Sequence, residues 1–218
     1  MKTSHIVHDY FERESRRFDA IYEQDKPAGQ RLVDRLFRGV ILERFRLICN
    51  LAPVPGSWSV LDVGCGSGRF SVALALAGSS HVLGVDVAAS MITIANEAAA
   101  AMHVAERCEF VVSSFLALER REKFTNVVAT GYCDYLEDPL PHLQKMAAMC
   151  SHKMFLSFPK RWEPRVLVRK ARFALERGYV RFYSHAEVVG LMAQAGIPAE
   201  RYSMIDLGRD WIIVVRVA

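Results

Sequence analysis

The sequence has no apolar run long enough to cross a membrane. Its longest apolar stretch, residues 70–78, falls far short of the ~18 residues that a spanning helix needs. Residues 1–9 also lack the apolar core of a secretory signal peptide. We therefore expect the protein to remain in the cytoplasm.

Cysteine is scarce, and its spacing excludes the usual metal and disulfide patterns. The five cysteines are odd in number, and they show neither C-x-x-C spacing nor the Cys/His pairing of zinc sites. We expect free, mostly buried thiols. His5 and His8 form H-x-x-H near the chain start without a third ligand, so no metal site is predicted.

Internal repeats, low-complexity tracts and a large net charge are absent as well. With 218 residues, 51% of them apolar, the chain is long enough for one domain with a full core. The net charge is only +4, yet residues 151–218 carry twelve Lys and Arg against six Asp and Glu. This excess indicates an anionic partner near the C-terminal part of the chain.

The first 56 residues read as a helical arm or lid. Residues 7–23 hold aromatic side chains among many charges, and a Pro-Ala-Gly sequence at 27–29 interrupts them. From residue 31 to 51, apolar side chains recur at helical spacing, which predicts an amphipathic helix.

Residues 57–218 alternate between short apolar runs and helical patterns. We predict strands at residues 59–63, 81–86, 109–113, 126–130, 153–158, 201–207 and 211–217. Helices are predicted at residues 67–77, 90–102, 139–150, 164–176 and 185–195. The alternation implies an α/β, Rossmann-like three-layer sandwich with a mostly parallel sheet. Only Gly208, Arg209 and Asp210 separate the last two strands, so these should form an antiparallel hairpin at one end of the sheet.

The most informative stretch is the glycine-rich turn at residues 61–70, Leu-Asp-Val-Gly-Cys-Gly-Ser-Gly-Arg-Phe. Its glycines let the backbone approach a ligand, and the helix that follows directs unpaired N–H groups at that ligand. Asp86, at the end of the next predicted strand, is placed to accept hydrogen bonds from ribose hydroxyls. Turn and carboxylate together predict a nucleoside site. Arg69 stands where a dinucleotide fingerprint needs a small residue, and no P-loop sequence is present.

Asp62-x-Gly64-x-Gly66-x-Gly68 and Asp86 resemble the first motifs of the class I S-adenosylmethionine-dependent methyltransferases. The resemblance covers residues 60–217 and implies a seven-stranded sheet whose last strand is antiparallel. It also implies S-adenosyl-L-methionine as cofactor. The residues it assigns to cofactor binding are Asp62, Gly64, Cys65, Gly66, Gly68, Asp86, Val87, Met91, Ser114, Phe115, Thr130 and Gly131. Ser114 stands where the family commonly has an acidic residue, so it would hydrogen-bond the adenine without charge.

The loop after the fourth predicted strand is the expected acceptor side. In this architecture ligands lie beyond the carboxyl ends of the strands, which makes Tyr132, Asp134 and Tyr135 candidates for lining the pocket and orienting an acceptor. The alternative is that the tyrosines cap the sheet edge and Asp134 stabilises the turn. No Asn/Asp-Pro-Pro-aromatic run occurs here, and Cys133 lacks the Pro-Cys context of a nucleophile. His142 and His152 are expected to be surface or capping residues.

A basic segment follows the fifth predicted strand, within a helical insertion at about residues 160–182. Residues assigned to the acceptor are Tyr10, Tyr135, Arg161, Trp162, Arg165 and Arg169. The basic side chains would recognise a carboxylate, a phosphate or an anionic membrane surface that holds a lipophilic acceptor; the alternative is a solvated helix face. Nucleic acid is not expected, because aromatic residues are not interleaved through the segment.

The sequence thus predicts a methyltransferase of the small-molecule branch, monomeric or homodimeric, that moves a methyl group in line to a small or lipophilic acceptor, anionic acceptors included. Two alternatives stay open. One is a non-catalytic S-adenosylmethionine-binding regulatory subunit, which exposed apolar surface on the helix at residues 31–51 would favour. The other is a nucleotide-dependent oxidoreductase, which Arg69 speaks against.

Overall fold

The computed structural model describes residues 43–161 and 179–217. Their strands form one seven-stranded sheet. Its strands are β1 (Ser59–Val63), β2 (His81–Asp86), β3 (Cys108–Val112), β4 (Phe124–Ala129), β5 (Cys150–Pro159), β6 (Tyr202–Asp206) and β7 (Asp210–Arg216). The central strands are buried on both faces, which explains why they read as continuous apolar runs in the sequence.

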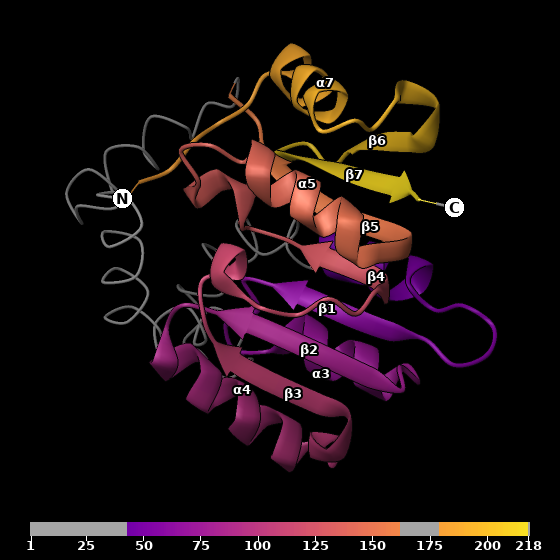
Figure 1. The fold of residues 1–218 in the computed structure, drawn as a ribbon, viewed down its shortest axis with the longest axis vertical. Helices are drawn as coiled ribbons and strands as arrows, with labels where there is room; N and C mark the ends of the chain where they lie inside the picture. The colour runs from indigo at the N-terminus through magenta and orange to yellow at the C-terminus, as the bar shows by residue number, and fades with distance from the viewer. Residues whose placement is uncertain (1–42, 162–178, 218) are drawn as a thin grey trace, which may run out of the picture.

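The strand order is β3-β2-β1-β4-β5-β7-β6, and β7 runs antiparallel between β5 and β6. In Figure 1 the arrowheads of β1, β2 and β4 point to one edge of the sheet, whereas that of β7 points the other way. The hairpin between β6 and β7 turns at Gly208, whose φ of 79° favours glycine. The predicted seven-stranded sheet and its antiparallel last strand are therefore confirmed.

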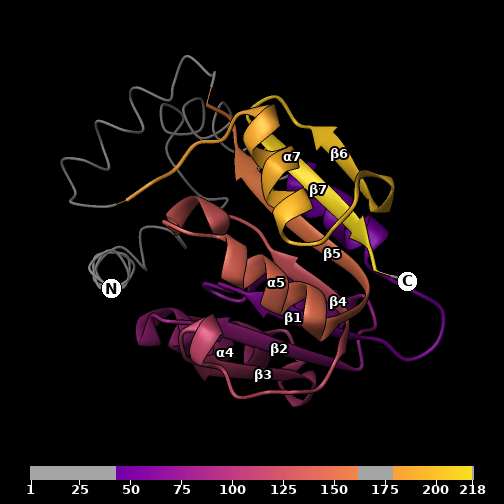
Figure 2. The same cartoon turned by 45° about the horizontal axis from the view of Figure 1, so that its top comes forward.

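Helices cover both faces of the sheet and make the predicted three layers. The helical residues 43–51, α3 (Arg69–Leu76) and α4 (Ala89–Ala101) contribute to one apolar cluster, which includes Ile48, Leu74 and Ala99. The opposite face carries α5 (Leu140–Met149) and α7 (His185–Gln194), which lie side by side in Figure 2.

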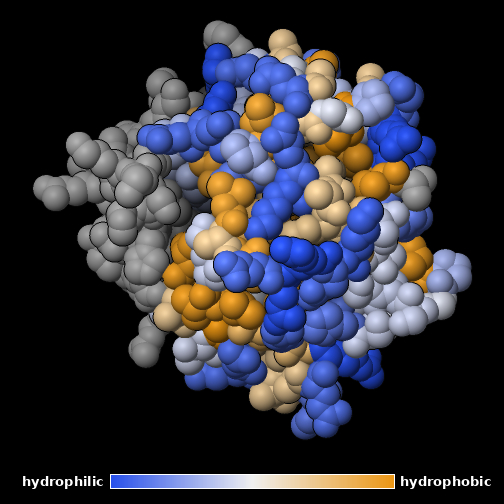
Figure 3. Space-filling model, in the orientation of Figure 1, coloured by the Kyte–Doolittle hydropathy of each residue, from blue (hydrophilic) through white to orange (hydrophobic). Residues whose placement is uncertain are grey.

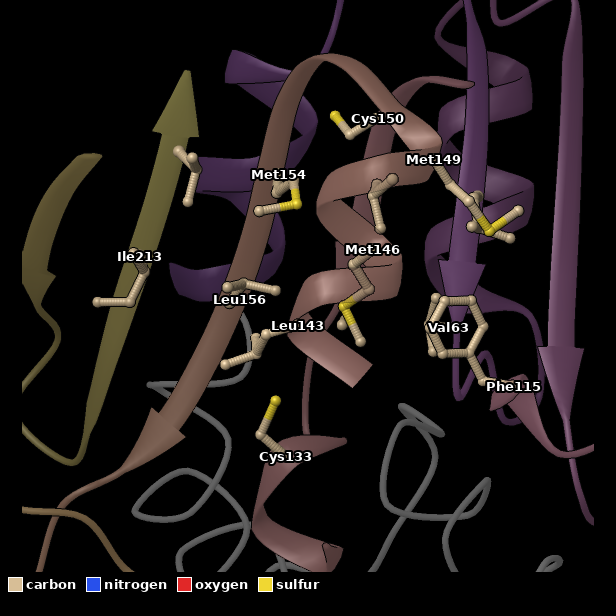
Figure 4. Packing of buried hydrophobic residues seen from close by; sticks show 14 of the residues in the cluster. Val63, Phe115, Cys133, Leu143, Met146, Met149, Cys150, Met154, Leu156 and Ile213 are labelled. Atoms are coloured by element: carbon tan, nitrogen blue, oxygen red, sulfur yellow. The ribbon is translucent and has the colours of Figure 1, made fainter. Parts of the chain in front are cut away.

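The packing of α5 shows how the second face is closed. Leu143, Met146 and Met149 come from the buried side of this helix. In Figure 4, Leu143 and Met146 lie toward Met154 and Leu156 of β5, whereas Met149 points away from them. All of these side chains except Met149 are fully buried. Burial of each large apolar side chain stabilises the fold by about 1.5–3 kcal/mol, so α5 is firmly held against β5.

The helix ends follow the local sequence. Ser184 and Glu187 form a reciprocal capping box at the start of α7, and Gly196 with φ 77° follows its end. Several predicted boundaries differ from the observed ones by one or two residues. The largest difference is at β5, which begins at Cys150, directly after α5, rather than at residue 153. The early start is explained by pairing with Phe124, whose carbonyl also accepts a hydrogen bond from the Ser151 hydroxyl.

Most of the predicted N-terminal arm (1–56) and of the insertion (about 160–182) lies outside the described residues, as does the predicted helix at 164–176. The part of the 31–51 helix that is described, residues 43–51, packs on the sheet through Ile48, and Phe45 contacts Phe70 with ring centroids 5.2 Å apart. Among the described helices, none is both long enough and apolar enough to span a membrane.

Candidate functional site

The glycine-rich turn joins β1 to α3 at the carboxyl edge of the sheet. Gly64, Gly66 and Gly68 have φ values of 69°, 53° and 73°, a region that side chains disfavour. The N–H groups of Gly64 and Cys65 both donate to the carbonyl of Val85 on β2, at 2.8 and 3.1 Å. The turn is thereby tied to the neighbouring strand.

The three glycines are needed for different reasons. A Cβ on Gly64 would lie 2.6 Å from Cδ2 of Tyr132, and one on Gly68 would lie 2.8 Å from Cβ of Ala95. Packing within the protein therefore leaves no room for a side chain at either position. A Cβ on Gly66 would meet nothing within 4 Å. Gly66 thus presents bare backbone to open space, as a ligand cradle requires.

Asp86 ends β2 beside this open backbone. Its Oδ2 accepts from the N–H of Gly66 at 2.9 Å, and its Oδ1 accepts from the N–H of Ala88 at 3.0 Å. These two backbone donors fix the orientation of the carboxylate beside the turn. The predicted ribose acceptor, Asp86, therefore lies directly beside the open backbone of Gly66.

Asp62 occupies a different environment from Asp86. It is only 2% exposed, and the Ser71 hydroxyl donates to its Oδ2 at 2.7 Å. Burial raises the pKa of Asp62 to about 7, although the Ser71 hydrogen bonds act in the opposite direction. The structure therefore places Asp62 beneath the turn, where it bonds α3, rather than on the open surface beside Gly66.

The predicted adenine side lies at the ends of β2 and β3. Met91 is 3% exposed in the first turn of α4, Val87 is half-buried, and Ser114 is exposed directly before buried Phe115. Figure 3 shows hydrophobic side chains gathered on an otherwise largely hydrophilic face. Leu116 is one of the exposed large hydrophobic residues, so the side chains beside Ser114 are partly apolar.

The loop after β4 is the predicted acceptor side of the site. Thr130 and Gly131, which has a φ of 64°, lead into a 3-10 turn at Cys133–Tyr135. Asp134 is 3% exposed, whereas Tyr135 is half-buried. Cys133 is fully buried and burial raises its pKa, which agrees with the predicted structural role.

Residues at the end of the predicted insertion and directly after it hold this loop in place. The N–H of Arg181 donates to the carbonyl of Asp134 at 2.7 Å, and its Nη1 donates to the carbonyl of Glu137 at 2.9 Å. The hydroxyl of buried Tyr183 donates to the carbonyl of Cys133 at 2.7 Å. The loop is thus fixed through its backbone.

Tyr132 lies against Gly64 and shares a 2.8 Å hydrogen bond between its hydroxyl oxygen and Nδ1 of His142. Burial raises the pKa of Tyr132 above its ordinary value and lowers that of His142 to about 4. Both groups are therefore neutral near pH 7. His142, predicted as a surface or capping residue, instead contacts a predicted site residue.

Arg44 was not among the residues predicted for the site. Its Nη1 donates to the Ser157 hydroxyl at 3.1 Å and lies 3.4 Å from Oδ2 of Asp210, while Ser157 accepts from the N–H of Gly131. Its Nη2 lies 4.0 Å from the position of a Cβ on Gly131, and its buried Nε has no hydrogen-bond partner among the described residues. A positive charge therefore lies against the loop after β4. The only sequence signal was an arginine on a predicted amphipathic helix.

The predicted acceptor residues are only partly described. Arg161 donates to Oε1 of Glu187 at 2.6 Å, so its charge is paired within the protein. Lys160 pairs with Asp206 and lies 3.9 Å from the ring centroid of Trp211. Tyr10, Trp162, Arg165 and Arg169 lie outside the described residues. Within the described ranges, no three His, Cys, Asp or Glu side chains are grouped so that they could hold a metal ion.

The sequence matches a known family over this same region. A family described as a methyltransferase domain matches residues 60–153, which run from β1 through the start of β5. Ribosomal protein L11 methyltransferase of Caldanaerobacter subterraneus is 35% identical over 89 residues, and that of Lactobacillus johnsonii is 36% identical over 85 residues. Each match covers 39% of this chain but only 28% and 26% of the respective relative.

Solved structures resemble nearly the whole chain. Magnesium protoporphyrin IX methyltransferase from Synechocystis, solved with bound SAH, has a TM-score of 0.75 and 19% identity, and the similarity covers 98% of this chain and 99% of that one. Geranyl diphosphate C-methyltransferase from Streptomyces coelicolor has a TM-score of 0.71 and 13% identity, with 99% and 97% covered. At these identities the similarity establishes the fold.

Proposed function

We propose that this chain, which carries a class I S-adenosylmethionine-dependent methyltransferase domain at residues 60–153, transfers the methyl group of that cofactor to a small or lipophilic acceptor. The observation that carries the proposal is the pairing of Gly66 with Asp86. Open backbone at the turn and an oriented carboxylate on the next strand fit a nucleoside whose ribose lies on Gly66.

The residues present fit the three parts of the cofactor. Asp86 would accept hydrogen bonds from the ribose hydroxyls. Ser114, Met91 and Phe115 would surround the adenine. Arg44, whose guanidinium faces Gly131, would pair with the carboxylate of the amino-acid end. Bound there, S-adenosylmethionine supplies an electrophilic methyl group on its sulfonium.

The protein's own contribution is to hold the acceptor in line with the methyl group and to exclude water. Tyr132 remains protonated because its phenol is buried, so it acts in this proposal as a wall and not as a base. Tyr135 and Asp134 are the proposed acceptor-side residues of the same loop. A carboxylate acceptor needs no deprotonation, which is consistent with the lack of a strong base among the site residues that the structure describes.

The acceptor class is supported by two observations. Two of the solved structures that cover nearly the whole chain are named for a porphyrin and for geranyl diphosphate, both small molecules. The chain also has an excess of basic residues after β5, which suits an anionic group or an anionic membrane surface. The relatives named for ribosomal protein L11 match only 39% of the chain, and therefore give a protein acceptor less support.

Calorimetric titration with S-adenosylmethionine, S-adenosylhomocysteine and NADH tests the cofactor. We expect micromolar binding of the first two and none of NADH. Binding of NADH alone would overturn the proposal. Turnover is then tested with radiolabelled cofactor and a panel of porphyrin carboxylates, prenyl diphosphates and a basic protein control. Tight cofactor binding with no transfer to any of them would favour the regulatory-subunit alternative.

A further inference from the structure

We infer that His142 is a positioning residue of the cofactor site, because it joins Tyr132 and Phe115 in one row of three rings. The inference rests on the proposed function. Tyr132 follows β4 and Phe115 follows β3, whereas the glycine-rich turn follows β1 and Asp86 ends β2. In the strand order β3-β2-β1-β4, the two aromatic residues therefore come from the strands that flank the nucleoside site.

The contacts of His142 reach both of these residues. Its Nδ1 lies 2.8 Å from the hydroxyl oxygen of Tyr132, and the two rings meet edge to face with centroids 5.5 Å apart. On the other side its ring stacks on Phe115 with centroids 6.2 Å apart and planes inclined by 30°. One imidazole thus contacts both flanking segments.

Tyr132 connects the His142 ring to the glycine-rich turn. A Cβ on Gly64 would overlap the Tyr132 ring at 2.6 Å, so the ring lies in direct contact with the first glycine of the turn. If the phenol loses its partner on α5, the ring is free to rotate away from Gly64. The wall beside the cofactor would then lose its fixed position.

Lys145, one turn further along α5, supports the Phe115 end of the row. Its Nζ donates to the carbonyls of Phe115, Leu116 and Leu118 at 2.8, 3.0 and 2.8 Å, and lies 5.1 Å from the Phe115 ring centroid. The 3-10 turn at Phe115–Ala117 is therefore held by α5. With Phe115 fixed, His142 has a rigid surface from which to orient Tyr132.

The inference is tested by a mutant cycle read out as the affinity for S-adenosylhomocysteine. His142→Leu removes the polar partner of Tyr132, whereas His142→Asn retains a polar side-chain atom close to the Nδ1 position. Tyr132→Phe removes only the hydroxyl. We expect His142→Leu and Tyr132→Phe each to weaken binding about 10-fold, the double variant to weaken it no further, and His142→Asn to stay within about 3-fold of the wild type.

Controls separate this role from general loss of structure. His152→Leu replaces a half-buried histidine on β5 and should leave the affinity unchanged. If His142→Leu fails to fold, Tyr132→Phe and His142→Asn still test the inference. Equal affinities in all variants, or additive losses in the double variant, would overturn it.

Failure of the proposed function gives a different result. In that case the wild type itself does not bind S-adenosylhomocysteine. The NMR chemical shifts of the His142 ring then show whether the His142–Tyr132 pair forms in the absence of a ligand. These signals are assigned by their disappearance in His142→Asn. We expect them to move in Tyr132→Phe, and unchanged shifts would show that the pair does not form.

Discussion

The N–H of Gly66 donates to Oδ2 of Asp86 across 2.9 Å, so the open backbone of the turn and the carboxylate of the next strand form one unit. The second carboxylate oxygen accepts from Ala88, at the start of α4. Asp86 therefore links the α3 side of the site to the α4 side. Its loss should affect both the ligand contact and the shape of the turn.

Asp86→Ala should weaken binding of S-adenosylhomocysteine by about 100-fold. Each of the two hydrogen bonds from the ribose hydroxyls to the carboxylate contributes about 1.5–3 kcal/mol, and the loss of both together is smaller than their sum. Asp86→Asn should lose nearly as much, since an amide presents one acceptor oxygen in place of two. Calorimetry on folded variants measures the change. Glu106→Gln, on the exposed surface, is the matched control. An Asp86→Ala variant that binds like the wild type would contradict the assignment of the ribose site.

Gly64 and Gly66 should respond differently to alanine. Gly64→Ala places Cβ against Tyr132 and should lower the free energy of unfolding by about 2–4 kcal/mol, from overpacking together with a left-handed φ. Gly66→Ala has space around its Cβ and should cost only about 1 kcal/mol, yet it should abolish cofactor binding because the methyl group occupies the cradle.

Gly196→Ala controls for the backbone strain in this pair. It has φ 77° and open space like Gly66, but it lies after α7. Denaturant unfolding and calorimetry on the three variants separate stability from binding. Normal cofactor affinity in Gly66→Ala would show that the ligand does not lie on this backbone.

Much of the fold could be predicted because its signals are local. The bounds of β1 and β2 agree with the prediction, since each is a short apolar run between turn residues. The hairpin of β6 and β7 follows from three residues between two strands. The start of β5 was missed because it depends on pairing with Phe124, 26 residues away in the sequence.

The site was predictable where one short motif carries it and not where the fold assembles it. Gly66 and Asp86 are recognisable from their spacing. Arg44 reaches the site through Ser157, which is 113 residues away in the sequence. His142 is a single residue in the first turn of α5, and only the arrangement of the loop after β4 shows that it contacts Tyr132. No local pattern distinguishes either residue from a surface side chain.

Asp62 should give the stability a pH dependence. Its pKa is about 7 in the folded protein and near 3.9 when unfolded, so the folded state binds more protons between these values. The contribution of Asp62 to stability is therefore full below about pH 4 and is lost as the pH rises to about 7. His142, whose pKa is lowered to about 4, gives the opposite slope over much of this range.

The difference between the wild type and Asp62→Asn isolates the first contribution. Guanidinium unfolding between pH 4.5 and 8 should show the wild type losing stability relative to Asp62→Asn as the pH rises, with a slope approaching 1.4 kcal/mol per pH unit. Ser71→Ala removes a hydrogen bond that lowers the pKa of Asp62, and should shift the loss to higher pH. Parallel curves for wild type and Asp62→Asn would show that Asp62 is ionised throughout.

Arg44 offers a test that separates the two ends of the cofactor. If its guanidinium pairs with the carboxylate of the amino-acid end, Arg44→Gln should weaken S-adenosylhomocysteine binding by about 10- to 100-fold, as expected for a charge-assisted hydrogen bond. Binding of 5′-methylthioadenosine, which has the nucleoside but no carboxylate, should change less than about 2-fold. Arg46→Gln, an exposed position on the same helix, should affect neither ligand. An equal loss of affinity for both ligands would mean that Arg44 acts only by holding Ser157 and Asp210. A purely structural role does not distinguish a ligand that has the carboxylate from one that lacks it.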